Sequence, residues 1–316
     1  MKRVFVFEYL TAVGPTEGNA GEMSALRAQG RQMRDAMVND LLQVRGHAVS
    51  VATARGAAAP PAGAQPCRAR RGEMMLPWLA REAALHDAVW LVAPECGGLL
   101  LQCRQAVPRA RWLGCDSVAI ALTTSKSATL AHLAAQGVCT PLAFAREGLR
   151  PGMCWVVKPD DGAGAQHTRV HGNLAAARQA QGAGSTLEPW VDGDAMSLSL
   201  LCRAGEAELL SLNRQHLHVD GDGLLHYRGV DIDCQPRHGA HGRAAAALAA
   251  QVARAIPGLR AYVGIDIVWH ATHGPVLIEV NPRLTCAYVG LSARLGRNLA
   301  AEMLATHAHE ARHAVA

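Results

Sequence analysis

The chain has 316 residues, of which 50% are hydrophobic, 18% are charged and 4% are aromatic, and its formal net charge is +5. This length is enough for two or three domains. Its apolar runs are shorter than the roughly 18 residues of a membrane-spanning helix, and its basic residues form no block, so neither a membrane nor a nucleic acid is an expected partner. Nine cysteines without CxxC spacing predict a reducing cytoplasm and no zinc site.

The first part of the chain alternates predicted strands and helices. The opening segment "MKRVFVFEYL" lacks a signal-peptide cleavage site, so we expect a strand that ends near Glu8. A helical stretch over 21–44 and strands over 46–53 and 87–95 follow. Residues 54–72, rich in Ala, Pro, Gly and Arg, predict a loop or a partly disordered excursion. This alternation favours a Rossmann-like parallel α/β domain over residues 1–118.

The second part of the chain begins with a predicted helix from about Ser125, closed by Gly137, with Pro141 just beyond. We expect the next elements to be a strand that enters a glycine-containing turn, a strand–bend–strand unit and a hairpin, over residues 153–168, 185–202 and 207–232. A helix with a long alanine run should follow the hairpin.

Two further apolar runs, residues 261–269 and 275–281, are separated by the segment HATHG. We expect a hairpin with a four-residue loop, Ala271 to Gly274, so that His270 pairs with Pro275. Counting back along both strands places two pairs on one face, Asp266 opposite Glu279 and Gly264 opposite Asn281. The other face should be core, formed by Ile265, Ile267, Ile278 and Val280.

Two carboxylates that face each other across a strand pair repel, so their placement needs a reason. Mg²⁺ binds carboxylate oxygens together with phosphate oxygens, and the asparagine adds a neutral oxygen on the same side. We therefore predict a metal site formed by Asp266, Glu279 and Asn281. If repulsion dominates, removal of one acid should raise the stability of the metal-free protein. The alternative is a solvent-facing strand pair whose acids are hydrated.

A magnesium site of this kind usually serves phosphate groups, so a phosphate-binding loop is also expected. The chain contains neither GxxxxGK[ST] nor GxGxxG. Lys158 instead precedes a turn with Gly162 and Gly164, whose backbone N–H groups could approach phosphate oxygens. Lys126, in the first turn of its predicted helix, is a second candidate because an anion nearby would explain its position. The alternatives are a glycine turn that binds nothing and a solvated lysine.

The segment "LEPWVDG" places an acid, Glu188, at the end of a predicted strand and before a bend. The backbone of such a bend can present N–H and C=O groups to a purine, while an acid contacts an amine or a ribose hydroxyl. The alternative is an ordinary surface turn.

Taken in order, these motifs resemble those of the ATP-grasp superfamily. The segments that carry the resemblance lie between residues 120 and 300: "SKSATLAHLAAQGVCTP", "WVVKPDDGAGAQ", "LEPWVDGDAMSLSL", "YVGIDIVW" and "LIEVNPR". The resemblance implies an α/β (α+β) fold in which two lobes clamp ATP. It also implies three domains: an amino-terminal domain over 1–118, a central lobe over 119–187, and a carboxyl-terminal lobe with the metal site over 188–316.

The resemblance also implies roles for single residues in binding ATP. Lys126 and Lys158 would contact its phosphates, with Gly162 and Gly164 in the flexible loop. Adenine and ribose contacts would come from the bend, through Glu188, Val191 and Asp194. Asp194 is assigned to the ribose because the glutamate that many members have after the bend is missing here.

Asp266, Glu279 and Asn281 would hold two Mg²⁺ ions, with Mn²⁺ as an alternative, and Arg283 would stabilise the transferred phosphoryl group or the substrate carboxylate. The implied reaction is ligation: ATP phosphorylates a carboxylate, and an amine attacks the acyl phosphate to give an amide. Both substrates are small molecules, and a homodimer is left open.

Four segments, "VFVFEYL", "VAPECGGLLLQC", "SLNRQHL" and "VNPRLTCAYVGLS", are similar to the tyramine–glutamate ligase group of methanofuran biosynthesis. This similarity implies L-glutamate and an aromatic amine as substrates, with Glu8, Glu95, Arg214 and Arg283 in the acceptor pocket. The alternatives are ordinary charges at loop ends, a purine-pathway or peptide-extending ligase of the same fold, and a nucleotide-binding regulatory protein without turnover.

Overall fold

The computed structural model describes residues 1–14, 20–146, 152–162 and 164–313, and it divides into two compact units. Unit 1 comprises residues 1–94, 99–117 and 283–316, and unit 2 comprises residues 95–98 and 118–282. The carboxyl-terminal segment therefore belongs with the amino-terminal part of the chain. The three domains predicted from the sequence remain a proposal beside this division.

Unit 1 contains a parallel sheet in the order β3-β2-β1-β4-β5. Its strands are β1 (Lys2–Glu8), β2 (His47–Ala52), β3 (Gln65–Cys67), β4 (Ala88–Val92) and β5 (Trp112–Leu113). β4 is buried along its whole length, as expected for a parallel strand that helices cover on both faces. The Rossmann-like prediction is confirmed, except that β3 forms an edge strand inside the predicted loop.

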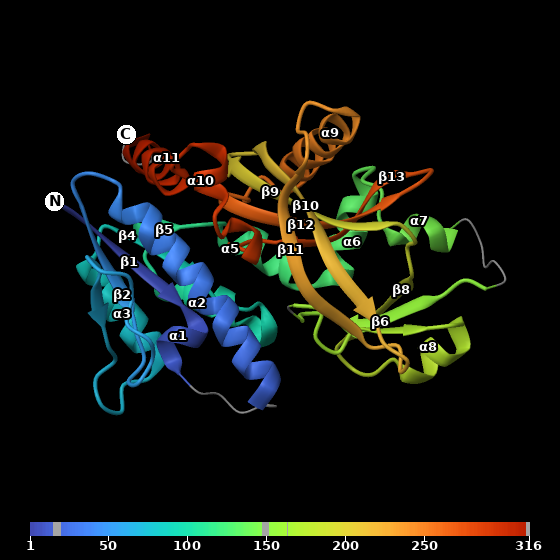
Figure 1. Cartoon of the computed structure of the whole chain (residues 1–316), viewed down its shortest axis with the longest axis horizontal. Coiled ribbons are helices and arrows are strands. Elements are labelled where there is room, and N and C mark those ends of the chain that lie inside the picture. Colours follow the sequence, from blue (N-terminus) through green and yellow to red (C-terminus); the bar gives the residue numbers. More distant parts are fainter. Residues whose placement is uncertain (15–19, 147–151, 163, 314–316) are drawn as a thin grey trace. The chain divides into compact units, whose positions relative to one another are not determined.

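The helices of unit 1 include α1 (Tyr9–Val13), α2 (Ala20–Leu42), α3 (Met75–Leu85), α4 (Leu99–Ala106), α10 (Leu291–Leu295) and α11 (Leu299–His313). α2 packs along β1 and β2, and α11 packs against α2 (Figure 1). The right-handed crossover rule places α2 and α3 on opposite faces, because β2 and β4 flank β1 on opposite sides.

Asp40 of α2 ties the carboxyl-terminal segment to unit 1. Its carboxylate accepts hydrogen bonds from the hydroxyls of Tyr288 and Ser292, and its carbonyl accepts one from the side chain of Asn298. The Tyr288 ring also packs edge-on against Trp90 of β4. These contacts explain why residues so distant in the sequence fold into one unit.

Unit 2 contains two sheets. The smaller has the order β7-β6-β8 and the larger, antiparallel sheet has the order β11-β10-β9-β12-β13. The strands are β6 (Trp155–Pro159), β7 (Arg169–His171), β8 (Ser185–Pro189), β9 (Asp194–Arg203), β10 (Glu206–Val219), β11 (Leu225–Gln235), β12 (Ala261–His270) and β13 (Gly274–Asn281). The helices are α5 (Ser117–Thr124), α6 (Lys126–Ala135), α7 (Pro141–Arg146), α8 (Leu174–Ala180) and α9 (Ala240–Ala255).

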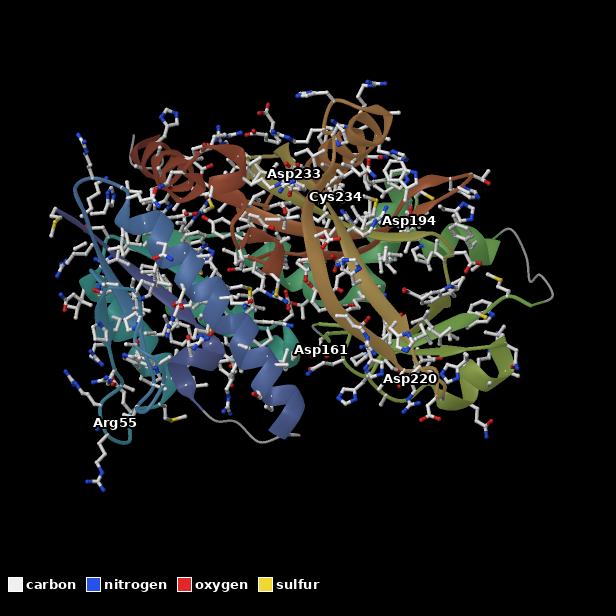
Figure 2. All side chains as sticks on the ribbon, viewed as in Figure 1. Arg55, Asp161, Asp194, Asp220, Asp233 and Cys234 are labelled. Atoms are coloured by element: carbon white, nitrogen blue, oxygen red, sulfur yellow. The ribbon has the colours of Figure 1, made fainter. Side chains whose placement is uncertain are left out.

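The predicted hairpin near Gly221 is confirmed as the long β10–β11 pair, whose tip joins the smaller sheet. Val170 donates its N–H to the carbonyl of Gly223, and Leu225 donates to the carbonyl of Thr168. Figure 2 labels Asp220, which follows β10 at this tip. The contact links the two sheets of unit 2.

The predicted facing of Asp266 with Glu279, and of Gly264 with Asn281, is confirmed in the β12–β13 ladder. The loop prediction is wrong, however, because His270 pairs with Gly274 and the loop is one residue shorter than expected.

A bulge in β13 compensates for the shorter loop. Asp266 pairs with Glu279 while the next residue, Ile267, pairs with Leu277, so that Ile278 is the extra residue. Leu277 is fully buried and Ile278 only half-buried, which corrects the predicted core position of Ile278. Ile265, Ile267 and Val280 are buried as predicted.

Among the helices that the structure describes, none has both the length and the apolar character needed to cross a membrane.

Candidate functional site

The helix that carries Lys126 begins where the sequence predicted. Ser125 caps α6, since its hydroxyl accepts a hydrogen bond from the N–H of Ala128. The carboxylate of Asp160, from the turn after β6, accepts hydrogen bonds from the Ser125 hydroxyl at 2.6 Å and the Ser127 N–H at 2.8 Å. The Lys126 N–H donates to the Asp160 carbonyl. Asp160 thus fixes the start of α6 to the end of β6, the strand that carries Lys158.

Burial raises the pKa of Asp160, but hydrogen bonds from Ser125 and Ser127 and the charge of Lys126 lower it by more. The net effect is a pKa below the ordinary value. Asp160 is therefore stabilised as the charged carboxylate in the folded protein.

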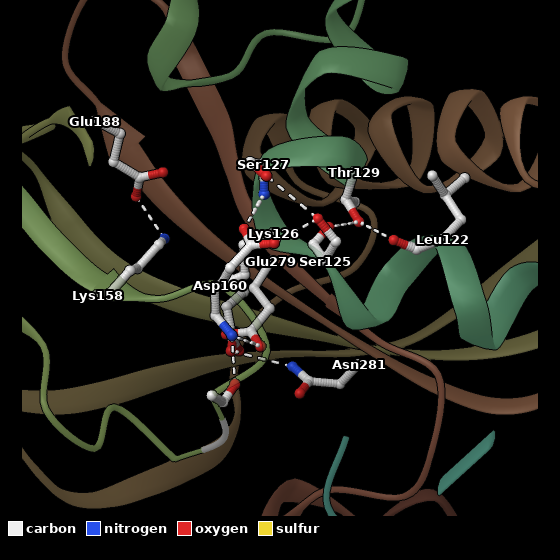
Figure 3. A network of polar contacts seen from close by, with 12 residues as sticks. Leu122, Ser125, Lys126, Ser127, Thr129, Lys158, Asp160, Glu188, Glu279 and Asn281 are labelled. Carbon is white, nitrogen blue, oxygen red and sulfur yellow. Dashed lines mark hydrogen bonds and ion pairs between the residues drawn. The ribbon is translucent and has the colours of Figure 1, made fainter. Parts of the chain in front are cut away.

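Lys126 is buried, with 6% of its surface exposed, and its ammonium group lies 3.1 Å from Glu279 Oε1 (Figure 3). The same ammonium donates to the carbonyl of Gly162 in the glycine-containing turn. This cation therefore contacts both the predicted metal acid and the predicted phosphate loop.

Asp266 lies on β12, directly opposite Glu279 on the neighbouring strand β13. Its Oδ1 accepts a hydrogen bond from the side-chain amide of Gln215 at 2.9 Å, and its Oδ2 accepts one from the Asn281 amide at 3.2 Å. The structure therefore brings together all three predicted metal ligands and Lys126. These contacts and the Lys126 charge offset the repulsion between the two acids, so the expected gain in metal-free stability on removing an acid loses its basis.

Gln215 was missed by the sequence analysis. It lies on β10, and β9 separates β10 from β12 in the sheet. No local motif marks this residue. A β10 side chain can reach Asp266 only because of the strand order in the sheet. That order depends on pairing between distant segments, which a local motif does not reveal.

Lys158 and Glu188 form a second buried ion pair. The Lys158 ammonium lies 2.5 Å from Glu188 Oε1, and the two side chains are 7% and 4% exposed. Val156 pairs with Glu188 and Lys158 pairs with Thr186, so the two charged residues are diagonal neighbours on one face of the smaller sheet. The second oxygen of Glu188 is buried and accepts no hydrogen bond from the described residues.

The bend after Glu188 contains the predicted residues Val191 and Asp194. Val191 is buried and Asp194 begins β9 with an exposed side chain, labelled in Figure 2. Gly193 lies between them with φ of 147°, and a Cβ there would come within 2.2 Å of the Trp269 carbonyl. Only glycine permits this close approach to β12.

The loop glycines have different surroundings. Gly164 has φ of 69°, a left-handed conformation that favours glycine. A Cβ at Gly162 would lie 2.9 Å from the Pro159 side chain. Residue 163 lies outside the described residues.

The remaining four candidates are divided between the two units. Arg214 is exposed, and strand alternation places it on the face of β10 opposite its neighbour Gln215. Glu95 is buried in unit 2, while Glu8 and Arg283 belong to unit 1. Arg283 donates to the carbonyl of Leu284.

Glu8 caps α1, accepting hydrogen bonds from the N–H groups of Leu10 and Thr11. Burial raises the pKa of Glu8 above its ordinary value, although these hydrogen bonds and the charge of Arg34 act in the opposite direction. Its role in an acceptor pocket remains a proposal.

Two family models match the chain. An ATP-grasp domain model matches residues 123–287, and a pre ATP-grasp 3 domain model matches residues 47–120.

The chain is 29% identical over 208 residues to the tyramine–L-glutamate ligase of Methanocaldococcus jannaschii, and 26% identical over 211 residues to that of Methanocaldococcus fervens. Both alignments cover 65% of this chain, and they cover 58% and 61% of the two relatives. Among solved structures, an ATP-grasp superfamily protein from Archaeoglobus fulgidus is similar, with a TM-score of 0.71 and 20% identity over 96% of this chain and 88% of that one.

Proposed function

Because the chain belongs to the ATP-grasp family, we propose that it is an ATP-dependent ligase that joins a carboxylate to an amine. The observation that supports this most is the meeting of Asp266, Glu279, Asn281 and Lys126 in unit 2. Two carboxylates, an amide and a buried cation suit a complex of a metal ion with a phosphate, because such a complex carries both signs of charge.

The donor set fits Mg²⁺ by its chemistry. Asp266 and Glu279 supply carboxylate oxygens and Asn281 an amide oxygen, all hard ligands of the kind this ion prefers. When bound, the ion would neutralise charge on the transferred phosphoryl group. In the absence of ligands, the ion pair of Lys126 with Glu279 keeps both side chains in position. An exchange of partners would give the lysine to a phosphate oxygen and the carboxylate to the cation.

The region around Glu188 fits the nucleoside part of ATP. Its Oε2 is a buried acceptor without a donor among the described residues, and an adenine amino group or a ribose hydroxyl would supply that donor. Lys158, held by Glu188 Oε1, would contact a phosphate. The backbone at Val191 would serve the adenine edge, and Asp194 the ribose.

The proposed reaction has two steps. A carboxylate oxygen of the acid bonds to the γ-phosphorus of ATP, and the bond from that phosphorus to the bridging oxygen breaks as ADP leaves. The amine nitrogen then bonds to the acyl carbon, the bond from that carbon to the phosphate oxygen breaks, and the nitrogen loses a proton to give the amide. The residues named above act by positioning the reactants and by balancing charge.

For the substrates, we propose L-glutamate together with tyramine, tyrosine or a similar aromatic amine, in a methanofuran-type cofactor pathway. The similarity to two tyramine–L-glutamate ligases supports this choice. Arg283 would bind a substrate carboxylate or the transferred phosphoryl group, and Glu8 and Glu95 would contact a substrate. Arg214 is left out of this proposal, because it lies on the face of β10 opposite Gln215. Mn²⁺ in place of Mg²⁺ and a homodimer belong to the same proposal.

The test is ADP release with Mg²⁺ across a panel of carboxylates and amines, with mass spectrometry of the products. We expect a γ-glutamyl amide with an aromatic amine. Turnover with an unrelated acid and no glutamyl amide would disprove the substrate assignment but retain the ligase class. Binding of ATP without ADP release, with any pair of substrates, would instead favour a regulatory protein.

A further inference from the structure

A cavity of about 390 Å³ lies within unit 1, between α1, α2 and the loop that follows β2. Its volume falls in the range of small-molecule sites. Among the described residues that line it, none is acidic and four are arginines: Arg27, Arg31, Arg34 and Arg55. None of these residues takes part in the proposed reaction.

Three of the arginines lie on one face of α2. Arg27, Arg31 and Arg34 are spaced by four and three residues, so their side chains are neighbours on the helix surface. Like charges at this spacing destabilise a helix, and a bound anion would remove that cost. Arg55 also lines the cavity and is exposed. Figure 2 labels it on the loop that follows β2.

Arg34 is fixed in the wall of the cavity. Its side chain is fully buried, and its guanidinium donates to the carbonyls of Ala58 and Ala59 at 3.1 and 3.2 Å and to Asp35 Oδ1 at 2.8 Å. These contacts hold a positive charge in place without a ligand. Asp35 offsets the charge of Arg34, and Arg27, Arg31 and Arg55 add further positive charge to the lining.

The neighbouring acid, Glu8, has its oxygens committed elsewhere. Its two carboxylate oxygens accept the N–H groups of Leu10 and Thr11, and it packs beneath α2 at Gly30. A Cβ at Gly30 would approach Glu8 Oε1 to 2.6 Å, so glycine is what allows this packing. Glu8 therefore serves the start of α1. It interacts electrostatically with Arg34, but its carboxylate oxygens accept no hydrogen bond from an arginine among the described residues.

Arg27 has a buried Nε that donates to no acceptor among the described residues. An unused buried donor costs free energy unless an acceptor is provided. Arginine suits carboxylate and phosphate groups because its planar fork can donate two parallel hydrogen bonds. Arg27 thus lines the cavity and carries a buried donor without an acceptor among the described residues.

We propose that this cavity binds a small metabolite that carries more than one negative charge on carboxylate or phosphate groups. Arg27 and Arg31 contact its oxyanions, Arg34 supplies a fixed positive charge, and Arg55 contributes from its exposed position. This proposal does not depend on the ligase reaction, because no residue is shared with it.

The experiment is titration calorimetry on the full chain without ATP or metal, at constant ionic strength. The probes are inorganic phosphate and L-glutamate, with chloride as the background anion. The double variant Arg27→Gln/Arg31→Gln should bind the preferred probe at least about tenfold more weakly, the loss expected for charge-assisted contacts. Arg55→Gln, at an exposed position, should weaken binding less.

Arg68→Gln is the matched control, since Arg68 is an exposed residue of unit 1 that does not line the cavity. It removes the same charge and should leave the affinity unchanged. Tighter binding of phosphate identifies a phosphate ester as the ligand class, and tighter binding of glutamate identifies a carboxylate. The proposal is wrong if neither probe binds, or if the double variant and Arg68→Gln bind as the unmodified chain does. ADP release measured separately tests the ligase proposal.

Discussion

The candidate site of unit 2 and the cavity of unit 1 differ in the charges that they bring together. In unit 2, the two buried lysines each contact a carboxylate, Lys126 with Glu279 and Lys158 with Glu188. In unit 1, arginines gather around a cavity that has no acidic lining residue in the described part of the chain. A site that contains both signs of charge suits a complex of metal and phosphate, whereas a site of one sign suits a free anion. The same difference predicts how each unit responds to mutation.

The largest effect on stability should come from breaking the Lys158–Glu188 ion pair, which is more deeply buried than the Lys126–Glu279 pair. Glu188→Leu leaves the Lys158 ammonium buried without its partner, so the free energy of unfolding should fall by about 3–5 kcal/mol. The double variant Lys158→Met/Glu188→Leu removes both charges and should recover most of that loss. Urea denaturation of the two variants measures the difference. If the single and the double variant were equally unstable, the unpaired charge of Lys158 would not be the cause of the loss. The lysines of unit 2 would then not depend on their carboxylate partners.

The next effect concerns the acids of the larger sheet. Asp266→Asn or Glu279→Gln should lower ATP turnover about 100-fold or more, because each removes a charged ligand from the proposed cation. Asp231→Asn, at an exposed acid of β11 in the same sheet, is the control and should leave turnover near normal.

The same variants test the charge balance without metal. Glu279→Gln should lower the metal-free melting temperature, because Lys126 loses its charged partner. A higher melting temperature would mean that repulsion between Asp266 and Glu279 dominates, as sequence reasoning alone suggested.

A smaller effect is expected at Gln215, the residue that holds Asp266. Gln215→Leu removes the hydrogen bond to Oδ1, and loss of such a supporting contact typically weakens metal binding by about 10–100-fold. Titration with Mn²⁺, with and without nucleotide, measures this affinity directly. Leu217→Ala, at an exposed site on the same strand, is the matched control. Equal metal affinity in Gln215→Leu and the unmodified chain would show that Asn281 alone positions the carboxylate.

The alternation of apolar and polar residues was enough to predict the strands and the two facing acids. It did not predict the loop length and the bulge that set their register. Alternation along residues 261–281 predicted Asp266 opposite Glu279, and the ladder has this pairing. The predicted loop was one residue too long, and the bulge at Ile278 restores the register. Nothing in the alternation of apolar residues marks a bulge, because the extra residue is itself apolar. The pair was therefore predicted correctly through two errors that cancel.

Contacts between distant segments could not be predicted. Gln215 reaches Asp266 because β9 lies between β10 and β12, and strand order depends on the packing of the whole unit. The Asp40 contacts that draw Tyr288 and Ser292 into unit 1 have the same origin. The edge strand β3 was hidden by the Pro- and Ala-rich composition of its surroundings, since pairing with β2 overrides weak propensity.

The smallest effects concern pH, and they should have opposite signs in the two units. The pKa of Asp160 in unit 2 is lowered, so its stabilising contribution is present above its unfolded value of about 3.9 and is lost as pH falls through the folded pKa. The pKa of Glu8 in unit 1 is raised, so its contribution is present below its unfolded value of about 4.3 and is lost as pH rises through the folded pKa.

Asp160→Asn should therefore cost about 1–2 kcal/mol at pH 7, the usual value of a capping interaction, and less in acid. Glu8→Gln should reduce the loss of stability that accompanies a rise from pH 4 to 7. Urea denaturation at several pH values gives, for each variant, the difference in free energy of unfolding from the unmodified chain as a function of pH. If the two differences changed with pH in the same direction, burial and hydrogen bonding would not act on the pKa values of these two carboxylates in opposite directions.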